Sequence, residues 1–391
     1  MNAQKKLFPI LVCILSLSLL TGCSFAVNQS RVASEIDETH TPTSLSTSTA
    51  TRPIKTETPL IPTLPPSPLP TPTLLPKEPI RTFPIEGEEL AYSSDGTMLA
   101  LSQARIETIL LIDPLTGDTL RSVDLHPLKG LYHTIFDMTF SHDDKWLAAG
   151  GNGHAVYFYD VITGEEINGT GAAGDIIDVD FSYNDEFFSF VHTFGPAYAQ
   201  ILYSKGQIDP DYFKIELPAS LTAYSIAFSP LEPLLVTGSY NNTASSFNSF
   251  VQIWDLAPCI NGEACEPDLV AETKLINPNG FVKTTCFTQP GELTLHIGNE
   301  LWKWNYITNE KKTLLYEAKP VEKLICNQST IGLVYENGDF LLIEPTNNTT
   351  SNAFKIDSAI FDSPYDIELS PDGTELAVAA FDHPLRIWEL R

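Results

Sequence analysis

The sequence has few basic residues: 23 Lys and Arg stand against 49 Asp and Glu, which gives a formal net charge of −26. Nearly all of the excess acid lies in residues 80–391. A surface of this charge repels phosphate backbones, so nucleic acid is not an expected partner. The excess of acidic residues also has a simpler explanation, because negative charge keeps an exported protein soluble.

Catalytic and metal-binding motifs are also lacking. The eight His residues are scattered, and none has a second metal ligand at a recognised spacing. No nucleophile elbow, phosphate loop or dinucleotide fingerprint occurs. We therefore expect no catalytic residue, no metal, no cofactor and no enzyme activity. The hydrophobic share of 43% still supplies a sizeable core and excludes a wholly disordered chain or a coiled coil.

Long apolar runs are limited to the N-terminus. Lys5 and Lys6 precede the apolar run Leu7–Leu20, which is too short to span a bilayer comfortably but suits a signal peptide. The run ends in Leu20-Thr21-Gly22-Cys23, which resembles the lipobox of bacterial lipoproteins. That resemblance implies cleavage after residue 22 and a diacylglyceryl thioether on Cys23, which anchors the chain to the bacterial cell membrane on its extracytoplasmic side. The alternative is an ordinary cleaved signal peptide followed by a chance Cys.

The segment after Cys23 is rich in proline. Twelve of the 29 prolines lie between Pro42 and Pro84, among many Ser and Thr residues. Such a composition favours extended, unpacked chain. At about 3.1 Å per residue it can span on the order of 150 Å, so residues 23–79 are interpreted as a disordered tether.

The remaining sequence is repetitive, and one half of the repeat is an apolar strand that ends in a turn signal. The clearest copy is Glu368-Leu369-Ser370-Pro371-Asp372-Gly373. The residue before the turn recurs seven times, at intervals of 39 to 59 residues, as Tyr92, Phe140, Phe181, Phe228, Phe287, Cys326 and Leu369.

The other half of the repeat is an alternating strand that ends in an aromatic or aliphatic residue, usually followed by an acid. It also occurs seven times, ending at Ile112-Asp113, Tyr159-Asp160, Tyr203-Ser204, Trp254-Asp255, Trp304-Asn305, Ile343-Glu344 and Trp388-Glu389. Three copies continue into a turn that needs a positive φ at Gly or Asn, at Leu115-Thr116-Gly117, Ile162-Thr163-Gly164 and Ile307-Thr308-Asn309.

The strand ends Ile253-Trp254-Asp255 and Ile387-Trp388-Glu389 resemble those of the WD-repeat family, and the two turn types are similar to that family's other consensus points. The resemblance covers residues 80–391 and implies an all-β, seven-bladed WD-repeat-like β-propeller, because a repeat of this length fits a four-stranded blade. The chain stops after the third strand of the last blade. We expect residues 80–85 to supply its outer strand and close the ring.

The cysteines give information on the cellular compartment of the protein, because disulfides form outside the cytoplasm. Cys259 and Cys265 flank a short segment inside a long insertion of an exported protein, which predicts a local disulfide between them. Cys286 and Cys326 fall on inner strands of adjacent blades, where we expect buried free thiols.

The connections between blades carry aromatic residues that we interpret as a binding face. Blade four has two insertions, at residues 239–250 and 257–270, and the first shares its face with these connections. The candidate binding residues are Tyr132, His133, Tyr224, Phe281, Phe361 and Tyr365. Aromatic side chains around a propeller channel suit a peptide or a partner loop.

The sequence thus predicts a monomeric, membrane-anchored propeller that binds a protein or peptide or serves as a scaffold. One alternative is a propeller enzyme or small-ligand receptor with a site in the central channel, which would place His, Asp and Glu side chains at the channel mouth. Another is a structural spacer, which would have a featureless face.

Overall fold

The computed structural model describes residues 74–390, apart from residues 126–133, 194–197, 204–206, 209–212, 216, 218–220, 244–245, 261–265, 277–279, 317–320, 328–329, 345–348 and 363–364. The chain divides into two units, Met1–Leu64 and Pro65–Arg391, and the described residues all belong to the second. The predicted signal peptide, the predicted lipidation site Cys23 and most of the predicted tether lie outside the described residues. Among the described residues, no helix is long and apolar enough to cross a membrane.

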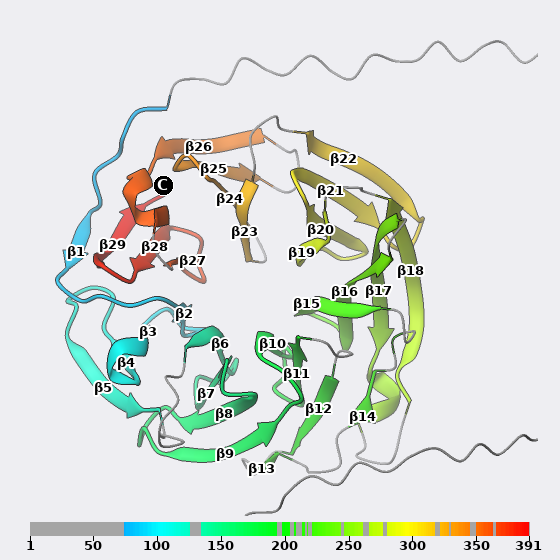
Figure 1. The fold of residues 1–391 in the computed structure, drawn as a ribbon, viewed down its shortest axis with the longest axis horizontal. Helices are drawn as coiled ribbons and strands as arrows, with labels where there is room; N and C mark the ends of the chain where they lie inside the picture. The colour runs from blue at the N-terminus through cyan, green and yellow to red at the C-terminus, as the bar shows by residue number, and fades with distance from the viewer. Residues whose placement is uncertain are drawn as a thin grey trace, which may run out of the picture. The chain divides into compact units, whose positions relative to one another are not determined.

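The described strands form antiparallel meanders in seven sheets, six of four strands and one of five. Figure 1 shows the sheets arranged around a common centre, with the first strand of each meander innermost. The innermost strands are β2 (Leu90–Tyr92), β6 (Ile135–Phe140), β10 (Ile176–Phe181), β15 (Thr222–Phe228), β19 (Val282–Gln289), β23 (Val321–Asn327) and β27 (Tyr365–Leu369). The second strands are β3 (Leu99–Gln103), β7 (Trp146–Gly151), β11 (Phe187–His192), β16 (Leu234–Thr243), β20 (Glu292–Ile297), β24 (Thr330–Tyr335) and β28 (Glu375–Ala380).

The third strands carry the predicted aromatic or aliphatic ends, and the fourth strands lie outermost. The third strands are β4 (Thr108–Ile112), β8 (Ala155–Asp160), β12 (Tyr198–Tyr203), β17 (Ser246–Asp255), β21 (Glu300–Asn305), β25 (Asp339–Glu344) and β29 (His383–Glu389). The outer strands are β5 (Thr119–Asp124), β9 (Glu166–Gly171), β13 (Gln207–Ile208), β18 (Asp268–Ile276), β22 (Glu310–Tyr316), β26 (Thr349–Lys355) and β1 (Arg81–Phe83), and β14 (Phe213–Lys214) also pairs with β12. The 3₁₀ helices are η1 (Ala104–Ile106), η2 (Ala257–Cys259) and η3 (Ser358–Asp362).

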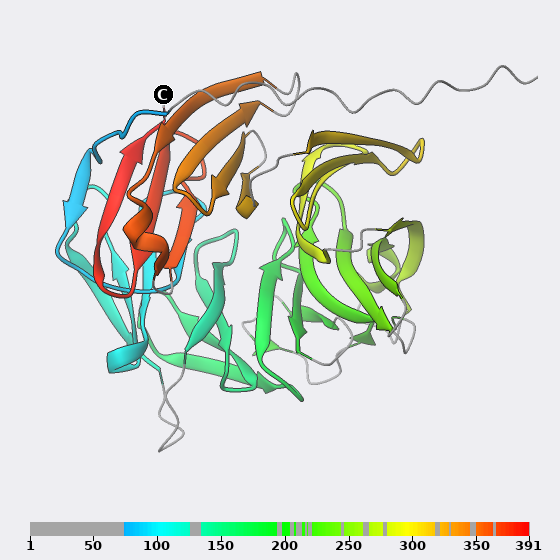
Figure 2. The same ribbon diagram turned by 45° about the horizontal axis from the view of Figure 1, so that its top comes forward.

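The strand that opens the described chain completes the sheet that ends it. β1 pairs antiparallel with β29, with Arg81 opposite Ile387 and Phe83 opposite Leu385, as the sequence indicated for residues 80–85. Figures 1 and 2 both show β1, in blue, beside β29, in red. The pairing gives β29 a partner strand on both sides, so the last strand of the chain is not a sheet edge.

Hydrophobic clusters fill the spaces between neighbouring sheets, one at each of the seven junctions. The cluster between the last and first sheets joins Ala377 and Leu385 to Leu90 and Leu99. Each sheet is therefore apolar on both faces, and the core is a ring of interfaces between sheets rather than one central mass. Burial of this apolar surface is the main force that holds such a ring together.

The predicted turn signals close the inner hairpins through side-chain hydrogen bonds. The Ser141 hydroxyl donates to the Asp143 carboxylate, 2.9 Å away, and accepts from the backbone N–H of Trp146. The same Ser pairing recurs at Ser93, Ser182 and Ser370. The residue after each acid or Asn has a positive φ, and it is Gly96, Asp144, Asp185 or Gly373. Local turn chemistry therefore marks the repeat in the sequence.

Two boundaries differ from the sequence interpretation. The insertion at residues 239–250 is not a loop: it lengthens β16 and β17, whose pairing runs from Leu234 opposite Asp255 to Thr243 opposite Ser246. The tether also packs before residue 79, because Leu75 and Lys77 exchange backbone hydrogen bonds with Lys355 on β26. The prediction that the tether packs against nothing is thus wrong for its last residues.

Candidate functional site

Five of the inner strands carry a β-bulge at the same position, near the strand start. In β6, for example, Ile135 pairs with Gly151 and Asp137 with Gly150, which leaves Phe136 unpaired between them. The bulge residues are Phe136, Ile177, Tyr224, Lys283 and Glu322. A bulge re-aims a side chain and is common beside functional sites. We call this end of the channel, where the inner strands begin, the bulge end, and the opposite end the turn end.

An apolar arc, defined here as Phe136, Ile177, Tyr224, Tyr240 and Phe281, runs along the bulge end over four consecutive sheets. The ring of Tyr224 lies 4.3 Å from that of Phe281 and 6.4 Å from that of Tyr240, between centroids. These three rings are half-buried, and Phe136 is 40% exposed. The predicted residues Tyr224 and Phe281 therefore meet, while the sequence interpretation did not include Phe136, Ile177 or Tyr240.

The rest of the bulge end is partly charged. Phe361 and Tyr365 form an edge-to-face pair with centroids 4.7 Å apart, and both are half-buried against the core. Burial raises the pKa of Tyr365, and the nearby Glu322 carboxylate, which hydrogen-bonds it, raises the pKa further. Tyr132 and His133, also predicted for this face, lie outside the described residues. The candidate residues thus form two separate contacts, Tyr224 with Phe281 and Phe361 with Tyr365.

Carboxylates of the inner strands tie neighbouring sheets together, a feature that the sequence interpretation missed. Asp137 on β6 accepts a hydrogen bond from the backbone N–H of Val179 on β10, at 2.7 Å. Asp178 on β10 accepts one from Ile226 on β15, at 2.8 Å, in the same way. The sequence does mark these Asp residues, because each lies three residues before the Phe that precedes the turn: Asp137 before Phe140 and Asp178 before Phe181. Recognising it requires knowing which strands become neighbours.

Among the described residues of the inner strands, one Lys lies close to a set of six carboxylates, which are those of Glu89, Asp137, Asp178, Asp180, Asp366 and Glu368. Lys323 on β23 pairs with Asp366 on β27. Burial raises the pKa of Asp137 to about 7, of Asp180 to about 6 and of Glu368 to about 8. Burial also raises the pKa values of Glu89 and Asp178 well above their usual range, since a low-polarity surrounding disfavours the charged form.

A cavity of about 590 Å³ occupies the turn end of the channel. Its lining includes Asp180, Glu368, His142 and Thr285. The hydrogen bond to Asp185 raises the pKa of His142 against the effect of burial. Among the described residues, no three His, Cys, Asp or Glu side chains are placed to hold a metal ion. The cavity therefore offers carboxylates and one imidazole for polar contacts with a ligand.

The cysteines differ in part from the sequence interpretation. Cys286 on β19 and Cys326 on β23 form a disulfide, with Cα atoms 6.3 Å apart, so the expectation of free thiols is wrong. The physical reason is an offset of one residue between neighbouring inner strands. Cys286 lies one residue before Phe287, which precedes the turn after β19, and it faces Cys326, which precedes the turn after β23. Cys259 is disulfide-bonded too, but Cys265 lies outside the described residues, and the pairing of the two stays a prediction.

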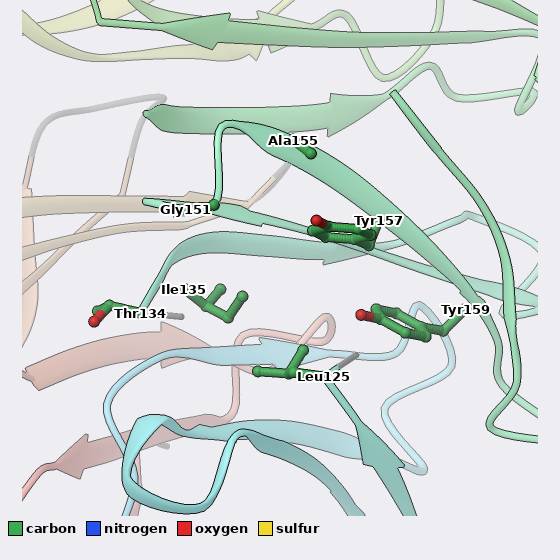
Figure 3. A pocket seen from close by; sticks show the side chains of 8 residues that line it. Leu125, Thr134, Ile135, Gly151, Ala155, Tyr157 and Tyr159 are labelled. Atoms are coloured by element: carbon green, nitrogen blue, oxygen red, sulfur yellow. The ribbon is translucent and has the colours of Figure 1, made fainter. Parts of the chain in front are cut away.

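A second crevice, between the first two sheets, is too small to be a candidate site. Figure 3 shows Tyr157 and Tyr159 beside Leu125 and Ile135, around a space of about 10 Å³. That volume holds about one water molecule. The ring of Tyr159 is buried there, and burial raises its pKa.

Comparison with known proteins agrees with this geometry. A family model described as "WD domain, G-beta repeat" matches residues 122–160 and 216–255. The chain carries WD40 repeats. The first matched segment ends with β8 and the second with β17, the third strands of their sheets. A comparison with curated proteins found no match.

Solved structures of propellers resemble most of this chain at low sequence identity. A chain from "Crystal Structure of Mitotic Checkpoint Complex" has a TM-score of 0.61 and 18% identity, over 84% of this chain and 96% of that one. The "Myceliophteria_thermophila Cps50 (Swd1) beta-propeller domain" has a TM-score of 0.62 and 13% identity, over 81% of this chain and 100% of that one. At these identities the likeness shows the fold alone, an all-β propeller.

Proposed function

We propose that the chain is a lipid-anchored, extracytoplasmic, seven-bladed propeller that binds a protein or peptide at the bulge end of its channel. The observation that carries this proposal is the repeated bulge, which re-aims Phe136, Ile177 and Tyr224 from consecutive sheets. Propellers with WD40 repeats commonly serve as protein-interaction scaffolds, and the two family matches support that class of function here. The seven sheets and the seven clusters between them support the blade count.

The composition of the bulge end favours a protein partner over a small molecule. The apolar arc is half-buried and open rather than enclosed, and aromatic side chains are enriched at protein interfaces because they bury much area at little entropic cost. Charged residues such as Lys283 and Glu322 continue the same rim. An apolar centre with a polar edge is the usual anatomy of a protein-binding surface.

Membrane anchoring belongs to the proposal through Cys23. The supporting feature is the lipobox-like Leu20-Thr21-Gly22-Cys23 behind a short apolar run. The Pro-rich tether would then lift the propeller away from the bilayer, so that the bulge end is free to meet a partner.

The test uses the full chain, solubilised from membranes, as bait for partner capture. Phe136→Ala with Tyr224→Ala should lower the amount of captured partner at least tenfold, because half-exposed aromatic anchors carry much of the energy of an interface. The matched control is Leu115→Ala with Ile162→Ala, which removes apolar side chains 68% and 72% exposed on turns at the opposite end. Equal capture by both double variants would contradict the proposal, as would unfolding of the Phe136 and Tyr224 variant.

The turn-end cavity supports a second function, a receptor for a small ligand. Its volume of about 590 Å³ is in the range of ligand sites, and Asp180 and Glu368 supply polar contacts. A thermal-shift screen of small cationic and neutral metabolites decides between the two. A shift that Asp180→Asn abolishes, with partner capture unchanged by the arc variants, would favour the receptor.

A further inference from the structure

Asp137 and Asp178 form a carboxyl pair directly beneath the apolar arc. Each follows a bulge residue, Phe136 in one strand and Ile177 in the next. Burial raises the pKa of both groups, and the neighbouring Asp137 carboxylate raises that of Asp178 further, while each carboxylate also accepts a backbone N–H of the neighbouring sheet. Two neighbouring carboxyl groups in a low-polarity setting do not both ionise readily, so the pair retains one shared proton that a cation can replace.

The other side of the channel shows what compensates the carboxylates when a cation is present. There Lys323 brings its ammonium group to Asp366, with Glu89 and Glu368 near enough to raise its pKa. The Lys323 ammonium thus neutralises part of the negative charge of the channel carboxylates. No Lys or Arg of the described residues makes an ion pair with Asp137 or Asp178.

The apolar arc adjoins the carboxyl pair, because Phe136 and Ile177 directly precede Asp137 and Asp178 in the chain. Burial raises the pKa of Tyr224, and the charges of Tyr240 and Asp178 raise it further, so the phenol of Tyr224 lies within electrostatic reach of Asp178.

We propose that the partner is a basic segment, and that one Lys or Arg side chain of it enters the channel past the apolar arc and replaces the proton shared by Asp137 and Asp178. This inference rests on the proposed function. The aliphatic stem would lie against the arc, where the aromatic faces of Tyr224 and Phe281 attract a cation. The cationic head would meet both carboxylates, and the displaced proton goes to the solvent. The net charge of −26 draws the same class of partner from a distance.

Replacement of a proton predicts a linked pH dependence of binding. The groups that face the pair from the surrounding strands are Asp180, Tyr224, Glu89, Lys323, Asp366 and Glu368. Of these only Lys323 is a cation, and it is engaged with Asp366. Affinity for a basic segment should therefore rise as pH increases from 5.5 to 8, because less work is needed to remove the shared proton.

The experiment begins with selection of a random heptapeptide display library on the full chain in detergent, at pH 7.5. The expected result is enrichment of Arg or Lys at one position, next to apolar residues. A selected peptide is then synthesised with Arg or with citrulline, its neutral isostere, at that position. The citrulline peptide should bind at least tenfold more weakly. Titration calorimetry of the Arg peptide at pH 6.5, in two buffers of different ionisation enthalpy, should show release of approximately one proton.

The matched variants separate this inference from the proposed function. Asp137→Asn with Asp178→Asn keeps two amide oxygens for the N–H groups of Val179 and Ile226, so the fold should persist while the Arg preference and the proton release vanish. The control is Asp180→Asn, one step nearer the turn end, which removes one neighbouring charge but should keep the Arg preference. Peptides that bind through Tyr224 with no basic preference and no proton release would overturn this inference and leave the proposed function standing.

Two other outcomes count against the inference. A library that yields no peptide binder at all overturns both proposals. Displacement of the bound Arg peptide by millimolar Mg²⁺ or Ca²⁺, with release of the same proton, would show that the pair is a site for an inorganic cation instead of a partner side chain.

Discussion

The carboxylate of Asp366 accepts a hydrogen bond, at 2.9 Å, from the backbone N–H of Leu90, a residue 276 positions earlier in the chain. The same carboxylate pairs with Lys323 of the preceding sheet. One side chain thus joins three neighbouring sheets at the point where the last sheet meets the first. A strand pair, β1 with β29, and a buried acid therefore close the ring together.

Removal of this carboxylate should destabilise the whole domain. Asp366→Ala leaves the N–H of Leu90 and the ammonium of Lys323 without their partner. We expect a loss of about 2 kcal/mol in the free energy of unfolding, because the backbone N–H of Leu90 and the partly exposed ammonium of Lys323 both lose their partner. Urea denaturation at pH 7 measures it. A variant within about 0.5 kcal/mol of the wild type, the range of an ordinary surface substitution, would refute this role for Asp366.

Stability should fall as pH rises from 5.5 to 8.5. Burial raises the pKa values of Asp180, Asp137 and Glu368 to about 6, 7 and 8, whereas unfolded carboxyls titrate near pH 4. A raised folded-state pKa gives stability that is present at low pH and lost as pH passes through that value. The melting temperature should drop on the order of 5 °C over this range.

One buried His opposes this trend on the acid side. Burial lowers the pKa of His296 to about 4, so its contribution to stability is lost as pH falls below 6.5. Because the three carboxyl groups outweigh this one His between about pH 4 and 6, we expect the stability maximum near pH 4 in calorimetric scans. Asp137→Asn should flatten the alkaline slope. A melting temperature that rises steadily towards pH 8.5 would be the opposite of what the buried carboxylates require.

The Cys286–Cys326 disulfide should matter to the junction between the sheets that begin with β19 and β23. Its loop spans 40 residues, for which loop entropy gives a stabilisation of about 4 kcal/mol at most. Replacing both residues by Ala should lower the free energy of unfolding by about 2 to 4 kcal/mol. Peptide mapping under non-reducing conditions should recover the linked pair. Alkylation of both thiols in the unreduced, unfolded chain would show that the link does not form.

The end of the tether should contribute to stability. The indole N–H of Trp388 donates to the backbone carbonyl of Lys77 at 2.8 Å, and the Lys77 ammonium lies 5.3 Å from the centroid of the Phe354 ring. Deleting residues 24–73 should leave the melting temperature unchanged. Deleting residues 24–79 should cost about 2 kcal/mol, since a buried donor loses its partner. Identical melting curves for the two truncations would place the domain boundary after residue 79.

The proposed membrane anchoring depends on one sulfur atom, that of Cys23. Cys23→Ser should abolish labelling with radioactive fatty acid and move the protein from the membrane to the soluble fraction, because the thioether supplies the stable anchor. The control is Cys259→Ser, which should still be labelled and retained. Unchanged labelling of the Cys23 variant would exclude the lipoprotein interpretation.

The sequence predicted what local chemistry dictates. The Ser-x-Asp turns and the strand ends at Trp254 and Trp388 depend on residues close in the chain, so their period was visible without a structure. The pairing of residues 80–85 followed from a simple count of strands. These features use short-range turn and alternation signals.

The parts that the sequence did not reveal depend on contacts between repeats. Asp137 reaches Val179, and Cys286 reaches Cys326, only because neighbouring inner strands are offset by one residue. The bulges at Phe136 and Ile177 need the pairing register, which alternation alone does not give. Tyr224 and Phe281 were therefore predicted to lie at the same end of the channel, whereas the other residues of the apolar arc and the acids beneath it were not predicted.

Photocrosslinking from single positions tests the binding face most directly. A photoreactive phenylalanine analogue at Phe136 or Tyr224 reports on the bulge end, and the same analogue at Leu115 or Ile162 reports on the turn end. Illumination of membranes that contain each variant should give a discrete adduct of higher mass from the bulge-end positions and none from the turn-end positions. Adducts from Leu115 or Ile162 alone would contradict binding at the bulge end.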